Sequence, residues 1–129
     1  MIPKTILLGE DEPNIAEMYK IAFDQAGFNT VLAANGEEVI EQAKNTRPDM
    51  ILLDINMPVK DGFEVLRDIS ENLELYSVLK NTPIVMLTNY NNPQDIEYCL
   101  KMGAQDYIVK AEWDPKKIVE KVKKILEIK

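Results

Sequence analysis

The sequence predicts a single α/β domain of the (βα)5 kind, a doubly wound parallel sheet with helices on both faces. Two observations predict this class. Five short apolar runs alternate along the chain with five stretches of helical periodicity, and such alternation implies parallel strands joined by right-handed crossovers. The 129 residues are also 46% hydrophobic and 29% charged, which suits one globular domain with one buried core.

The expected strands are short. The runs at 5–8, 50–53 and 84–87 are continuously apolar apart from Thr5, as expected of strands that are covered on both faces. The sequence predicts two further strands at 30–33 and 107–109. These five segments predict the complete sheet.

A helix is expected after each strand. The first begins near Pro13 and ends at Gly27, and the fifth begins at Pro115 behind the capping residue Asp114, since proline is favoured in a first turn and Asp at an N-cap. The apolar residues at helical spacing are Ile15, Tyr19, Ala22 and Ala26 in the first helix, Val39 and Ala43 in the second, Phe63, Leu66, Ile69 and Leu73 in the third, Ile96 and Leu100 in the fourth, and Ile118, Val122, Ile125 and Leu126 in the fifth.

Three features lie outside this pattern. Residues 72–82 lack clean periodicity, so we expect them either to extend the third helix or to form a loop packed on the surface. The lysines of the fifth helix are expected to form a solvated face, with docking of an acidic partner as the alternative. Cys99 is expected to be a small, partly buried apolar residue of the fourth helix.

The composition excludes several kinds of site. The chain has no histidine and one cysteine, which excludes a Ser-His-Asp triad, a histidine or thiolate zinc site, a phosphohistidine of its own and an internal disulfide. A bound metal must therefore have oxygen ligands, which favours magnesium, calcium or manganese.

Charge and hydropathy bear on partners and compartment. The net charge of −7 argues against direct binding of nucleic acid or of an anionic membrane surface. No apolar run approaches the roughly 20 residues of a membrane span, and the first residues do not resemble a secretory signal. We therefore expect a cytoplasmic protein.

Chemically active side chains follow four of the predicted strands. Glu10 and Asp11 come after the first strand, Asp54 after the third, Thr88 at the end of the fourth and Lys110 after the fifth. Ligands of open α/β sheets bind beyond the carboxyl ends of the strands. Taken singly, each residue except Asp54 has an ordinary structural explanation, such as helix capping or surface solvation. Taken together, they suit a divalent cation and a phosphoryl group.

Four motifs along the chain carry a resemblance to a known family. They are Ile6-Leu7-Leu8-Gly9-Glu10-Asp11-Glu12-Pro13, Leu52-Leu53-Asp54-Ile55-Asn56-Met57-Pro58 with Asp61-Gly62, Leu87-Thr88, and Gly103-Ala104-Gln105-Asp106-Tyr107-Ile108-Val109-Lys110. In these motifs, and over essentially its whole length, the chain resembles the receiver domain of two-component response regulators. The resemblance implies the strand order 2-1-3-4-5. We expect residues 1–129 to form one receiver domain, with no output domain.

The resemblance implies a phosphorylation-dependent switch. Asp54 would accept a phosphoryl group from the phosphohistidine of a sensor histidine kinase or of a histidine phosphotransfer protein. Mg²⁺, with Mn²⁺ as a substitute, would be held by Asp11, Asp54 and the backbone carbonyl of Asn56, with Glu10 acting through water. A carboxylate can form an acyl phosphate only if the charges of both groups are offset.

The remaining implied roles concern signalling. Lys110 would pair with a phosphoryl oxygen, and the Thr88 hydroxyl would bond another. The shift of Thr88 would let Tyr107 turn inward, which reshapes the surface of the fourth helix, fifth strand and fifth helix for a downstream protein target. The protein would then be no enzyme, because it would catalyse only its own phosphorylation and dephosphorylation.

Two other function classes stay open. A metal-dependent phosphohydrolase of the haloacid-dehalogenase kind also uses an aspartate at a strand end, but enzymes of that class resemble one another in a second aspartate where this chain has Asn56. The third class is a receiver-fold binding module that is never phosphorylated.

The chain departs from the family pattern at four positions. Asn89 and Tyr90 stand where smaller residues are common, and we expect them to hinder water and to slow the loss of the phosphoryl group. Ala111 replaces the proline that usually follows the lysine in a cis bond, so we expect a trans Lys110–Ala111 bond. Gly9 replaces an apolar strand residue.

Overall fold

The computed structural model describes residues 2–127. Within that range, every helix is too short or too polar to cross a lipid bilayer. The strands are β1 (Thr5–Gly9), β2 (Asn29–Ala33), β3 (Met50–Leu53), β4 (Ile84–Thr88) and β5 (Asp106–Val109), and the helices are α1 (Pro13–Gln25), α2 (Gly36–Thr46), α3 (Gly62–Glu71), α4 (Leu73–Leu79), α5 (Pro93–Lys101), the 3-10 turn η1 (Lys110–Glu112) and α6 (Pro115–Ile125).

The five strands form one parallel sheet in the order β2-β1-β3-β4-β5, which confirms the predicted class and strand order. Gly9 at the end of β1 pairs with Leu53 at the end of β3, and Thr88 at the end of β4 pairs with Val109 at the end of β5. Because the strands end in register, the residues that follow them lie at one edge of the sheet.

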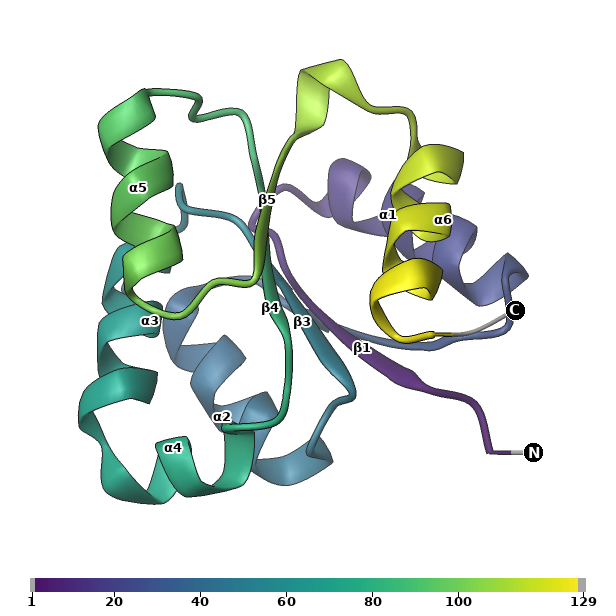
Figure 1. The fold of residues 1–129 in the computed structure, drawn as a ribbon. Coiled ribbons are helices and arrows are strands. Elements are labelled where there is room, and N and C mark those ends of the chain that lie inside the picture. The colour runs from purple at the N-terminus through teal and green to yellow at the C-terminus, as the bar shows by residue number, and fades with distance from the viewer. Residues whose placement is uncertain (1, 128–129) are drawn as a thin grey trace.

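Helices cover both faces of the sheet (Figure 1), with α2, α3, α4 and α5 on one side and α1 and α6 on the other. Successive strand residues point to opposite faces. In β3, Ile51 and Leu53 accordingly belong to the core under α2–α5, whereas Met50 and Leu52 belong to the core under α1 and α6. All four side chains are fully buried, as continuous apolarity predicted.

Residues 72–82 differ from both expectations. The Asn72 backbone is extended (φ −90°, ψ 113°) and its side chain accepts a hydrogen bond from the Leu75 N–H at 3.1 Å. Asn72 therefore ends α3 and caps the separate helix α4, as a short polar side chain can. Leu75 and Leu79 face the core, while Leu73 is 85% exposed, so the assignment of Leu73 to the apolar face of the third helix was wrong.

The fourth predicted helix also faces the sheet differently. In α5 it is Cys99 that is fully buried, whereas Leu100 is 46% exposed. The buried face of α5 therefore contains Ile96 and Cys99, three residues apart, rather than Ile96 and Leu100, four residues apart. Both spacings are compatible with one helix face. Cys99 is thus more deeply buried than expected.

Glycines allow close packing around the β3–α3 loop. A Cβ on Gly62 would lie 2.5 Å from the Asp54 carbonyl oxygen and 2.8 Å from Ile55 Cα. The Gly36 N–H at the start of α2 donates to the Lys60 carbonyl at 3.0 Å, and a Cβ there would lie 2.2 Å from the same oxygen. The backbone of the loop after Asp54 therefore packs closely against the first residues of both α2 and α3.

Gly9, the departure noted in the first strand, has a steric reason. A Cβ at this position would lie 2.8 Å from Val39 Cγ2 and 3.3 Å from Leu53 Cδ1. The absent side chain leaves room for α2 to pack closely over the end of β1, where the carboxylates begin.

Candidate functional site

Three carboxylates gather at the carboxyl edge of the sheet. Glu10 and Asp11 follow β1, and Asp54 follows the neighbouring β3. One oxygen from each lies within 4.8 Å of the others. Glu10 and Asp54 are 4% and 5% exposed, so their charges need compensation from nearby groups.

Lys110 supplies part of that compensation. Its Nζ donates to Asp54 Oδ2 at 2.6 Å and also to Glu10 Oε1. The Lys110 side chain is only 11% exposed. One ammonium against three carboxylates leaves an excess of two negative charges, which is the charge that a divalent cation with oxygen ligands would balance.

The ionisation of the site follows from this arrangement. Burial raises the pKa of Glu10, although the hydrogen bonds from Lys110 and from the Glu12 N–H oppose the increase. Burial acts to lower the pKa of Lys110, but its hydrogen bonds with Asp54 and Glu10 outweigh burial, so its pKa is raised. Lys110 therefore stays an ammonium at neutral pH.

Backbone groups hold the carboxylates in place. The Asn56 N–H donates to Asp54 Oδ1 at 3.3 Å, and the Glu12 N–H donates to Glu10 Oε2 at 3.1 Å. Glu10 and Asp54 therefore each have one oxygen bound to backbone and the other bound to Lys110. A cavity of about 140 Å³ opens beside them and is lined by Glu10, Asp11, Glu12, Ile15, Asp54, Asn56, Thr88, Asn89, Tyr90 and Lys110.

Six of the seven site residues expected from the sequence line this cavity, and the seventh, Tyr107, lies beside it. Thr88 is fully buried, and its Oγ1 accepts from the Tyr90 N–H at 3.3 Å. Tyr107 packs against the core under α2–α5, and its hydroxyl donates to the Tyr90 carbonyl at 2.6 Å. Burial raises the pKa of Tyr107. Thr88 and Tyr107 are therefore connected through the backbone of Tyr90.

Sequence reasoning placed Asn89 at the cavity but missed its bonding partner. Its Oδ1 accepts a hydrogen bond from the Ala111 N–H at 2.9 Å. The Lys110–Ala111 peptide bond is trans, as predicted. The sequence did contain a signal for this hydrogen bond. Two of the departures from the family pattern supply its partners, the polar Asn89 after Thr88 and Ala111, which has an N–H group, after Lys110.

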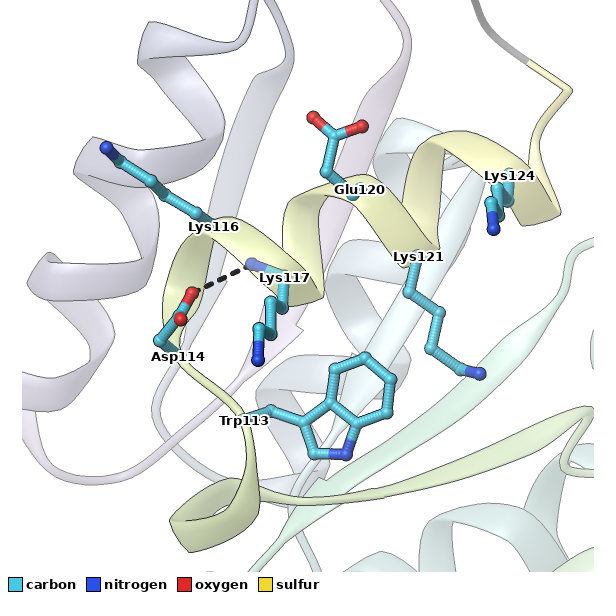
Figure 2. Close-up of a pocket in the computed structure, with 7 residues that line it drawn as sticks. All are labelled: Trp113, Asp114, Lys116, Lys117, Glu120, Lys121 and Lys124. Carbon is cyan, nitrogen blue, oxygen red and sulfur yellow. Dashed lines mark hydrogen bonds between the residues drawn. The ribbon is translucent and has the colours of Figure 1, made fainter.

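Four lysines of α6 line a separate groove (Figure 2), namely Lys116, Lys117, Lys121 and Lys124. Lys117 and Lys121 flank the Trp113 ring. The Lys121 ammonium lies 5.2 Å from the ring centroid and 2.9 Å from a carboxylate oxygen of Asp106. This groove shares no lining residue with the carboxylate cavity.

Comparison with known sequences identifies relatives. Residues 6–123 match the family model for the response regulator receiver domain. The chain is 32% identical over 123 residues to the alkaline phosphatase synthesis transcriptional regulatory protein PhoP of Bacillus subtilis, covering 95% of this chain and 48% of PhoP. It is 33% identical over 118 residues to the DNA-binding response regulator MtrA of Mycolicibacterium smegmatis, covering 92% of this chain and 48% of MtrA. The chain thus spans about half the length of these curated relatives.

Solved structures are similar to this chain over most of their length. The chemotaxis protein CheY4 of Vibrio cholerae superposes with a TM-score of 0.85 at 29% identity, covering 96% of this chain and 99% of CheY4. A chain of the CheX-CheY-BeF3-Mg²⁺ complex of Borrelia burgdorferi gives a TM-score of 0.84 at 31% identity, covering 97% of this chain and 90% of that chain. With this fold, this cavity and a family match over residues 6–123, the chain belongs to the response regulator receiver domains of two-component signalling.

Proposed function

We propose that Asp54 is the phosphoacceptor of this receiver domain. A carboxylate oxygen of Asp54 forms a bond to phosphorus while the bond from phosphorus to an imidazole nitrogen of the donor breaks, and the departing imidazole takes a proton from solvent. The product is an acyl phosphate on Asp54. One observation carries the proposal. The buried Asp54 carboxylate lines the same cavity as Glu10, Asp11, Thr88 and Lys110.

The residues present fit a magnesium ion. The three carboxylates carry an excess of two negative charges over Lys110, and all their donors are oxygen atoms, as Mg²⁺ prefers. Asp11, Asp54 and the Asn56 carbonyl would hold the ion, with Glu10 acting through water, and Mn²⁺ would substitute. When bound, the ion supplies charge compensation between Asp54 and the incoming phosphate.

The remaining side chains act on the phosphoryl group and on the signal. Lys110 neutralises a phosphoryl oxygen, and the Thr88 hydroxyl bonds another. The Thr88 hydroxyl would donate to the phosphate, and its movement toward the phosphate would displace the Tyr90 N–H, whose hydrogen bond it accepts. The same Tyr90 backbone binds Tyr107, so the change at Thr88 reaches the surface formed by α5, β5 and α6.

The partners we propose are proteins. A histidine kinase or a histidine phosphotransfer protein would supply the phosphoryl group, and a downstream protein would read the surface of α5, β5 and α6. The relatives named as DNA-binding or transcriptional regulators are about twice as long as this chain, so we do not extend DNA binding to residues 1–129. Catalysis would be confined to the chain's own phosphorylation and dephosphorylation.

Phosphorylation by a small acyl-phosphate donor tests the proposal. The wild-type protein should gain one phosphoryl group in the presence of Mg²⁺ and lose it on treatment with hydroxylamine. Asp54→Asn should gain none and keep its fold, because removal of one of several crowded carboxylates relieves repulsion. Asp95→Asn, in α5 and outside the cavity, is the matched control and should behave as wild type.

The same experiment separates the alternatives. Phosphorylation that persists in Asp54→Asn would refute the assignment. Steady hydrolysis of a phosphomonoester would favour the phosphohydrolase, and absence of any acyl phosphate on the wild-type protein would favour an unphosphorylated binding module.

A further inference from the structure

A side-chain hydrogen bond joins the loops that follow β4 and β5. Asn89 Oδ1 accepts from the Ala111 N–H at 2.9 Å. Asn89 comes directly after Thr88, and Ala111 directly after Lys110. The bond therefore links the neighbours of two residues that the proposed phosphotransfer uses.

The start of the turn that carries Lys110 needs an external acceptor. Residues 110–112 form the 3-10 turn η1, and Val109, which precedes it, makes no side-chain cap. The first N–H groups of a helical turn have no partner within the turn. Asn89 meets this need from the neighbouring loop, because Thr88 and Val109 are paired in register at the ends of their strands.

The Lys110 side chain contacts a carboxylate that lies beyond the neighbouring strand. Lys110 follows β5 and Asp54 follows β3, and β4 lies between these two strands. The Lys110 Nζ nevertheless lies 2.6 Å from Asp54 Oδ2. Asn89 comes directly after Thr88, the last residue of the intervening strand β4. A lysine side chain has four rotatable bonds, so the place of its ammonium depends on how firmly its backbone is held.

We propose that Asn89 is a positioning residue that holds Lys110 in place through the Ala111 N–H, and this rests on the proposed phosphotransfer to Asp54. Proline at position 111 has no N–H to donate, so the bond requires the residue present here. The two departures from the family pattern, at positions 89 and 111, are then directly connected. The N–H of the trans Lys110–Ala111 peptide bond donates to the Asn89 side chain.

The cleanest perturbation removes the donor without changing the cavity. Replacing Ala111 with its α-hydroxy analogue, lactic acid, exchanges the N–H for an ester oxygen and keeps the methyl group. We expect this ester to lower the rate constant of Asp54 phosphorylation about fivefold at saturating Mg²⁺, the value of one ordinary hydrogen bond. The Asn89→Ala substitution also widens the cavity, so its effect is interpreted only within a double-mutant cycle.

The double-mutant cycle distinguishes two roles of Asn89, positioning Lys110 through the Ala111 N–H and merely filling space in the cavity. In the Asn89→Ala background the ester should have no further effect on the rate. In the background of Asn91→Ala, an exposed asparagine of the same loop, the ester should keep its fivefold effect. Equal effects of the ester in both backgrounds would refute the proposal.

Hydrogen exchange of the Ala111 amide gives a second measurement that does not depend on activity. The amide should be protected in the wild type and in Asn91→Ala, and should exchange faster in Asn89→Ala. Protection that survives in Asn89→Ala would overturn the proposal. A wild-type protein with a protected Ala111 amide but no phosphorylation of Asp54 would instead overturn the proposed function and leave the hydrogen bond standing.

Discussion

Lys110 is the residue whose removal should change the stability of the site most. The substitution Lys110→Met keeps most of the alkyl chain and removes the charge. The Lys110, Glu10 and Asp54 side chains are only 11%, 2% and 8% exposed, so the two carboxylates would be left buried and uncompensated. Breaking a buried ion pair by removing one partner costs about 3–5 kcal/mol.

We therefore expect the free energy of unfolding to fall by about 3 kcal/mol, measured by urea denaturation without divalent cations. Added Mg²⁺ should reduce the loss, because the ion binds the folded state and balances the same carboxylates. In an Asp54→Asn background the cost should also be smaller, since one of the two buried charges is gone. Lys117→Met, at an exposed position of α6, is the control and should change stability by less than about 0.5 kcal/mol.

A loss below about 1 kcal/mol for Lys110→Met would refute this reasoning, because that is the value of an exposed ion pair. It would mean that the ammonium does not lie between Glu10 and Asp54 in solution. A loss that Mg²⁺ does not reduce would show that the carboxylates are not the groups that bind the ion.

Three further predictions concern other parts of the domain. Burial raises the pKa of the Cys99 thiol from 9.0 to about 11, so between pH 9 and pH 11 only the unfolded chain releases the thiol proton. The free energy of unfolding should therefore keep its full contribution from Cys99 below pH 9 and fall by about 1.4 kcal/mol per pH unit from pH 9 to pH 11. Unfolding of Cys99→Ala over the same pH range is the reference. Gly62→Ala should cost at least about 2 kcal/mol in urea denaturation, since its Cβ would lie 2.5 Å from the Asp54 carbonyl oxygen and the loop must move; an unchanged midpoint would contradict this. Tyr90→Ala should shorten the lifetime of phospho-Asp54 after removal of the donor, because Tyr90 lines the cavity and we expect its ring to hinder the approach of water. Equal decay of the two proteins would show that the ring does not restrict this approach.

The sequence was sufficient for most of the fold and for the location of the site. Apolar runs and helical spacing are local properties, and they predicted the five strands and five of the helices. The strand ends predicted the site because parallel strands place their carboxyl ends at one edge. Glu10, Asp11, Asp54, Thr88 and Lys110 accordingly line one cavity, although they come from the ends of four different strands.

Local pattern failed where two local preferences competed. An apolar residue at position 73 fits the spacing of the third helix, but the Asn72 side chain binds the Leu75 N–H and starts a new helix there. The helix that contains Cys99 shows the same limit, because i+3 and i+4 positions share one face and only packing decides which one is buried.

The tertiary structure alone decided how the site residues are connected. Lys110 bridges Asp54 and Glu10, and Asn89 binds the Ala111 N–H, across separations that no sequence period spans. Such contacts depend on the distance between loops, which the register of the sheet sets, and on which rotamers the packed neighbours permit. The sequence by itself therefore determined which chemical groups meet at this edge, and the folded sheet determined which of them touch.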